Sequence, residues 1–305
     1  MAAIAQGHRV HPDGRTWKSH FPKGDLWVFG YGSLIWKPPP HYDQRVPGYI
    51  SGYVRRFWQV RESFTLERAV HIPTFELTKL TLVIVHESRP GIHKQLTCSP
   101  STDHRGTPEQ PGRVVTVIER TFWETLDDPV AHLESELSST GKVWGAAYHI
   151  PASHAEEVHD YLDEREIDGY SAHYTPFHPT VDVEGASDST GSSPIICMVY
   201  IGQPTNPQFL RDAAHREPQH VAQVISAGHG LSGKGSEYLF MLEKGLEGLG
   251  LGTADVHVTD LVKRVRDIEA ELAEAEEEEE AELKVTRSLE VPAEEVDRDG
   301  RETIE

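Results

Sequence analysis

The sequence is poor in sulfur-containing residues and has no long apolar run. It holds 2 cysteines, Cys98 and Cys197, and 3 methionines among 305 residues. The cysteines have neither CxxC nor zinc-knuckle spacing, which argues against a disulfide framework and a structural zinc site. We find no basic leader followed by an apolar core and no apolar span of membrane length. We therefore expect a cytoplasmic protein with no membrane partner.

Positive charge is scarce as well. The chain carries 29 Lys and Arg against 49 Asp and Glu, which gives a formal net charge of -20. Residues 269–305 hold 16 acidic and 4 basic side chains, so -12 of the charge belongs to this tail and -8 to the rest. A nucleic-acid partner is therefore not expected. The run from Glu276 to Glu280 predicts a solvated helix end and a disordered tail, whose partner the composition does not name.

Signatures of metal and nucleotide sites are also missing. The chain has 18 histidines but no His-Glu-x-x-His, the spacing that places two imidazoles on one helix face. Gly228 to Gly235 approaches a phosphate-binding loop, but Gly235 stands where Ser or Thr would hold magnesium. We expect neither a metal nor a cofactor.

The stretch from Leu26 to Trp36 combines a strand pattern with a glycine-rich loop. Leu26 to Phe29 is a short aromatic and β-branched run, and Gly30-Tyr31-Gly32-Ser33 interrupts it. Two glycines allow the backbone to approach a ligand and expose N–H groups, and with the Ser33 hydroxyl such a loop suits a carboxylate or phosphate. A tight turn between two core strands is the alternative interpretation.

A helix is expected to begin at Ser153, because Ser153 and Glu156 have capping-box spacing. Its apolar face continues by helical spacing from Leu162 to Glu166, just before the Asp168-Gly169 turn. A carboxylate on a buried face is costly unless it has a task or a partner. The sequence therefore leaves two options for Glu166: a functional carboxylate, or a structural one paired with a buried arginine such as Arg56 or Arg105.

The remaining elements suggest one main domain with appended segments. Residues 1–25 are predicted to be a loose polar extension, residues 60–100 an insertion of inconsistent period, and residues 269–305 the acidic tail. The insertion is either a lineage-specific surface loop or translated non-coding sequence. Other expected strands are Val46–Gln59, Arg113–Glu119, Val143–Ile150, Phe177–Val183 and Ile195–Gly202, and other helices Pro218–Ala227, Ser236–Leu246 and one starting near Asp255.

An ordered series of short motifs resembles the ChaC-like γ-glutamylcyclotransferases, in particular their glutathione-specific branch. The series spans residues 26–268 and implies an α+β fold, a small closed β-barrel surrounded by helices. The matching motifs are Trp27–Lys37, Arg55–Gln59, Ser101–Gly106, Pro111–Val115, Tyr161-Leu162, Arg165-Glu166, Gly169-Tyr170, Tyr200–Gly202 and Glu237–Leu239.

The resemblance also implies a lyase reaction and a set of site residues. In that family the α-amine of a γ-glutamyl group attacks its own γ-amide carbonyl, so that glutathione gives 5-oxoproline and Cys-Gly without metal, nucleotide or other cofactor. Glu166 matches the general base. The substrate-binding loop matches Val28, Phe29, Gly30, Tyr31, Gly32 and Ser33.

Two other functions remain open at this stage. A cyclotransferase for other γ-glutamyl amines or peptides would share the Tyr31-Gly-Ser loop and the base, but it would lack the Ser101–Gly106 and Phe57–Gln59 motifs. A non-catalytic binding or regulatory protein would not need Glu166.

Overall fold

The computed structural model describes residues 16–61, 105–107, 109–132, 141–166, 170–180, 194–251 and 255–289. The chain divides into two units, residues 1–265 and 266–305. Most of the predicted insertion at residues 60–100 lies outside the described residues.

The strands are β1 Leu26–Gly30, β2 Gln44–Ser51, β3 Tyr53–Arg61, β4 Gly112–Glu119, β5 Lys142–Ile150, β6 Tyr170–Pro179, β7 Ile195–Gly202, β8 His229–Gly230 and β9 Gly233–Lys234. The helices are η1 Thr16–Ser19, η2 Ser33–Ile35, α2 Arg120–Trp123, α4 Ala155–Arg165, α5 Ala213–Arg216, α6 Pro218–Ala227, α7 Gly235–Glu247 and α8 Val256–Leu289.

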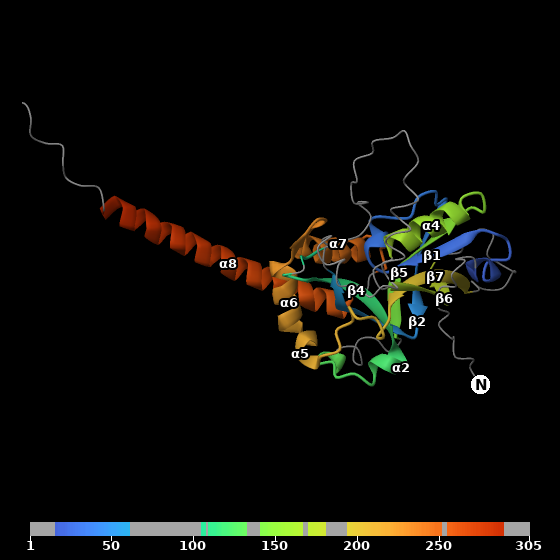
Figure 1. Ribbon diagram of the computed structural model, residues 1–305, viewed down its shortest axis with the longest axis horizontal. Coiled ribbons are helices and arrows are strands. Elements are labelled where there is room, and N and C mark those ends of the chain that lie inside the picture. Colours follow the sequence, from blue (N-terminus) through green and yellow to red (C-terminus); the bar gives the residue numbers. More distant parts are fainter. Residues whose placement is uncertain are drawn as a thin grey trace, which may run out of the picture. The chain divides into compact units, whose positions relative to one another are not determined.

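Five strands of the first unit form a closed barrel in the order β1-β5-β2-β6-β7 (Figure 1). All neighbours are antiparallel except β1 and β7, which close the barrel in parallel with Val28 opposite Met198. Closure leaves no free sheet edge, which removes a site of unwanted strand pairing. The predicted α+β fold with a small closed barrel is confirmed.

Two aromatic rings of the barrel strands pack against each other and against a pair of glycines. Phe29 and Phe177 are buried, with ring centroids 5.6 Å apart. Gly48 and Gly145 are cross-strand partners, and a Cβ on either would lie within 2.7 Å of one of these rings. Because real Cβ atoms do not come so close, both positions must remain glycine for the rings to pack.

Strands β3 and β4 form a separate antiparallel pair, with α6 and α7 packed against β4. Arg61, the last residue of β3, pairs with Gly112, the first residue of β4. The two ends of the stretch that connects these strands therefore adjoin. A bulge between Arg56 and Gln59 interrupts the pairing and leaves the Phe57 N–H to donate to His257 Nε2 at 3.1 Å.

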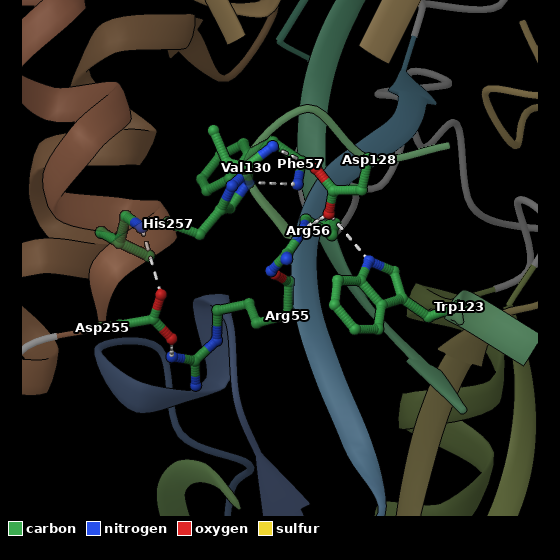
Figure 2. A network of polar contacts seen from close by, with 9 residues as sticks. Arg55, Arg56, Phe57, Trp123, Asp128, Val130, Asp255 and His257 are labelled. Carbon is green, nitrogen blue, oxygen red and sulfur yellow. Dashed lines mark hydrogen bonds and ion pairs between the residues drawn. The ribbon is translucent and has the colours of Figure 1, made fainter. Parts of the chain in front are cut away.

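Figure 2 shows the buried polar network around this bulge. Arg56 Nε and Trp123 Nε1 both donate to Asp128 Oδ2, at 2.7 and 2.8 Å. Arg55 Nη1 donates to Asp255 Oδ2 at 2.5 Å, and Asp255 Oδ1 accepts from the Val258 N–H at 3.1 Å. Asp255 thus caps the first turn of α8 and fastens it to β3.

The N-terminal part of the described chain is packed rather than loose. Trp17 and Phe21 are buried, and the Trp17 ring stacks on His159 of α4 with centroids 5.3 Å apart. His20 stacks on Tyr174 of β6 at 3.7 Å. The prediction of a loose polar extension is therefore wrong for residues 16–25, because its few aromatic residues bury themselves against the barrel.

Two helix ends differ from the sequence predictions. Helix α4 begins at Ala155, and the side chain of His154 at the N-cap position makes no capping hydrogen bond. The predicted capping box of Ser153 and Glu156 is therefore wrong. Glu156 Oε2 instead lies 3.3 Å from Lys18 Nζ. The last helix continues to Leu289, beyond the glutamate run where we expected it to end. Ala, Glu, Leu and Lys favour a helix even when it is exposed, which explains the additional turns.

Candidate active site

A pocket opens beside the loop after β1, with about 510 Å³ of space that includes solvent at its mouth. Its walls come from segments far apart in the chain: the loop and η2, the start of β4, the end of α4, and single residues of β6, β7 and α7. The lining residues are Phe29, Tyr31, Gly32, Ser33, Leu34, Val114, Val115, Arg165, Glu166, Tyr170, Tyr200 and Tyr238.

The loop lies close against β4 because of a glycine. A Cβ at Gly32 would lie 2.8 Å from Val115 Cγ1 and 3.3 Å from Tyr238 Oη. Ser33 follows as the first residue of η2, and its Oγ accepts a hydrogen bond from Arg165 Nη2 at 2.8 Å. The strand predicted at Leu26 to Phe29 is confirmed, and the Gly-Tyr-Gly-Ser loop after it lines the pocket.

Glu166 is the one acidic residue among the described residues that line the pocket. It follows the last turn of α4, where its N–H donates to the Leu162 carbonyl at 2.9 Å. Its side chain is 14% exposed, and Oε1 lies 3.5 Å from Arg165 Nε. The helical spacing from Leu162 thus predicted the inward placement of Glu166, although the start of the helix was misplaced.

The two arginines considered as structural partners of Glu166 have other contacts. Arg56 binds Asp128, as described above. Arg105 Nη1 donates to the Lys234 carbonyl at 3.0 Å and lies 3.7 Å from Glu237 Oε2. The arginine that lies beside the Glu166 carboxylate is Arg165, the preceding residue in the sequence.

Three tyrosines form a rigid, neutral wall. Tyr31 donates to the Tyr200 carbonyl at 2.8 Å, Tyr170 to the Val115 carbonyl at 2.9 Å, and Tyr200 to Asp163 Oδ1 at 2.7 Å. Burial, and next the Tyr170 hydroxyl, raises the pKa of Tyr31 well above 10. Burial, and next Asp163, raises the pKa of Tyr200 well above 10. The Glu166 carboxylate, which lines the same pocket, adds to both shifts.

The predicted residues divide into two groups. Phe29, Tyr31, Gly32, Ser33 and Glu166 line one pocket, whereas Val28 and Gly30 are not among its lining residues. Reasoning from the residues gave no role to Arg165, Tyr170, Tyr200 or Tyr238. Each of these stands in one of the short motifs quoted above, which was the available signal.

One cluster of side chains away from the pocket has ligand types for a metal. His41 Nε2 and His154 Nδ1 lie 3.5 and 3.4 Å from the Glu157 carboxylate oxygens. The two imidazole rings are stacked, with an interplanar angle of 7°. Lone pairs in nearly parallel ring planes do not converge on one point, so this arrangement is not a formed metal site.

Among the described residues, no helix is long and apolar enough to span a membrane.

Known proteins similar to this chain share most of its length. The glutathione-specific gamma-glutamylcyclotransferase of Schizosaccharomyces pombe is 36% identical over 252 residues, which is 82% of this chain and 96% of that protein. The Saccharomyces cerevisiae protein of the same name is 32% identical over 254 residues, 77% of this chain and 91% of that protein. A crystal structure of a γ-glutamyl cyclotransferase specific to glutathione from yeast has a TM-score of 0.59 and 29% identity, covering 80% of this chain and 96% of that one.

The family model described as ChaC-like protein matches residues 26–67 and 73–268. Its match covers the barrel, the loop after β1, the β3–β4 pair and the described residues of the pocket. The chain therefore belongs to the ChaC-like family.

Proposed function

We propose that this protein is a glutathione-specific γ-glutamylcyclotransferase, a lyase that converts glutathione into 5-oxoproline and Cys-Gly. The α-amine of the γ-glutamyl group attacks its own γ-amide carbonyl carbon. The new C–N bond closes the five-membered ring, and the old amide C–N bond breaks as its nitrogen takes up a proton. Water is neither consumed nor released, and no oxidant or reductant is needed.

Glu166 acts as the general base in this proposal. The amine is protonated at neutral pH and must lose a proton before it can attack, and a carboxylate at the pocket wall can accept that proton. The same group, once protonated, can deliver the proton to the departing Cys-Gly nitrogen. The single observation that carries the proposal is that Glu166 lines the same aromatic pocket as the Tyr31–Ser33 loop.

The loop binds the γ-glutamyl group in this proposal. Its backbone N–H groups and the Ser33 hydroxyl are suited to a carboxylate or to the developing oxyanion, because such donors are fixed before the reaction begins. The pocket also holds the flexible γ-glutamyl arm in a folded form, so that amine and carbonyl meet. Phe29, Tyr31 and Gly32 shape this space, while Val28 and Gly30 support the loop from β1.

Turnover of three substrates by the purified full-length protein tests the proposal. Glutathione, γ-Glu-Ala and γ-glutamyl-lysine are incubated separately, and 5-oxoproline is measured. We expect product from glutathione alone. Product from the other substrates as well would indicate a general γ-glutamyl cyclotransferase, and a folded protein that forms none would favour a binding or regulatory role.

A matched pair of variants on α4 links the activity to this pocket. Glu166→Gln removes the proposed base, whereas Glu164→Gln makes the same chemical change at an exposed residue two positions earlier. We expect the first to abolish turnover and the second to retain it.

Three further predictions remain to be tested. A cytoplasmic location, expected from the sequence, can be examined by cell fractionation. The insertion predicted at residues 60–100 begins too early, because Val60 and Arg61 end β3 and pair with Arg113 and Gly112. We propose that the stretch after β3 lies outside the catalytic fold, and deletion of residues 62–99 should leave folding and activity intact. A partner of the acidic tail, residues 269–305, can be sought with and without that segment.

A further inference from the structure

Arg165, the last residue of α4, contacts both parts of the proposed site. Its side chain is 5% exposed. Nη2 donates to Ser33 Oγ at 2.8 Å, Nη1 donates to the Lys37 carbonyl at 3.2 Å, and Nε lies 3.5 Å from Glu166 Oε1. One guanidinium therefore joins the substrate loop, the chain after η2 and the carboxylate.

The shape of the guanidinium makes these contacts interdependent. It is a flat, rigid fork whose donors have fixed directions, so the positions of Ser33 Oγ and Glu166 Oε1 are set by one group. A lysine would keep the charge but would place a single nitrogen where the fork has three. Because Ser33 accepts from Arg165 with its oxygen, its own hydroxyl hydrogen is left to donate to a bound anion.

The charge of Arg165 acts on Glu166 as well. A cation 3.5 Å from a carboxylate oxygen favours the ionised carboxylate, which is the form that accepts a proton. Burial of the guanidinium strengthens this effect, since water screens it less. Arg165 thus combines a geometric role toward Ser33 with an electrostatic role toward Glu166.

We propose that Arg165 is a positioning residue that orients the Ser33 hydroxyl toward the substrate and keeps Glu166 ionised opposite it. This inference rests on the proposed function. It is therefore tested only after wild-type protein has been shown to form 5-oxoproline; absence of that activity counts against the proposed function.

Arg165→Met and Arg165→Lys separate the two roles. Arg165→Met should raise KM about tenfold through the lost bond to Ser33 and should move the acid limb of the kcat/KM profile to higher pH, because Glu166 loses its cationic neighbour. Arg165→Lys should restore the acid limb but not KM, since the charge returns without the fork. A merely structural role would not produce this split.

A control and a double variant complete the experiment. Arg211 also donates to two backbone carbonyls, of Pro204 and Asn206, but it does not line the pocket, so Arg211→Met should leave KM and the pH profile unchanged. In a Ser33→Ala background, Arg165→Lys should cause no further rise in KM, and this test holds even where Arg165→Met fails to fold.

Three results would overturn the inference while leaving the proposed function intact. The first is a folded Arg165→Met protein with wild-type KM and acid limb. The second is an Arg165→Lys protein with wild-type KM. The third is a rise in KM for Arg165→Lys that is as large without the Ser33 hydroxyl as with it.

Discussion

Gly32 offers the sharpest test of the proposed substrate-binding loop. In Gly32→Ala the new methyl carbon would lie 2.8 Å from Val115 Cγ1 and 3.3 Å from Tyr238 Oη. Val115 is 3% exposed and is held in β4, so it cannot move away freely. Overpacking of this kind typically costs about 1–3 kcal/mol. For a domain of this size, that corresponds to a fall in Tm of roughly 2–12 °C.

The same methyl group should also weaken glutathione binding. Gly32, Val115 and Tyr238 all line the pocket, so the added carbon lies inside it. We expect Kd for glutathione to rise by at least about tenfold, the effect of losing one well-made buried hydrogen bond.

A second substitution separates the two effects. Val115→Ala removes the Cγ1 atom that the new methyl meets, so the double variant Gly32→Ala/Val115→Ala should unfold at a higher temperature than additive single changes predict. Its binding should stay weak, because the Gly32 methyl remains. Thermal unfolding and isothermal titration with glutathione, on both single variants and the double variant, give the comparison. Wild-type affinity in the double variant would show that the backbone at Gly32 does not approach the substrate closely.

The other predictions concern the base and the buried network. Glu166→Gln should lower kcat about a hundredfold or more while glutathione still binds, measured by steady-state kinetics and titration; retained turnover would refute the base assignment. Asp128→Ala should destabilise the protein by about 3–5 kcal/mol in denaturant unfolding, because Arg56 and Trp123 lose their buried acceptor; a change below 1 kcal/mol would contradict this. Burial, and next Arg56 and Arg55, holds the pKa of His257 well below its ordinary 6.5, so the unfolded chain binds the proton first. The stability that depends on neutral His257 should therefore be fully present above about pH 6.5 and fall as the pH drops below it. His257→Gln should flatten this pH dependence of the unfolding temperature.

Local pattern was enough to indicate several parts of the pocket. The composition of Leu26 to Phe29 predicted a strand, and the glycines after it were compatible with a ligand loop or a tight turn. Helical spacing placed Glu166 on the inward face of α4. Pro218 and Gly228 marked the ends of α6, whose observed range matches the prediction. These features depend on neighbours within a few residues, so the sequence contains them directly.

Other features depend on contacts between distant segments, and only the tertiary structure decided them. The parallel contact of β1 with β7 closes the barrel and brings Tyr200 to the pocket, although Tyr31 and Tyr200 are 169 positions apart. Arg165 showed no local sign that its guanidinium reaches Ser33, because that contact requires α4 to pack beside the loop. Likewise, Ser153 and Glu156 have the spacing of a capping box, but Glu156 forms an ion pair with Lys18 of the N-terminal segment. Sequence periodicity determines which face of an element is buried, whereas the partner on that face is set by how the whole chain closes on itself.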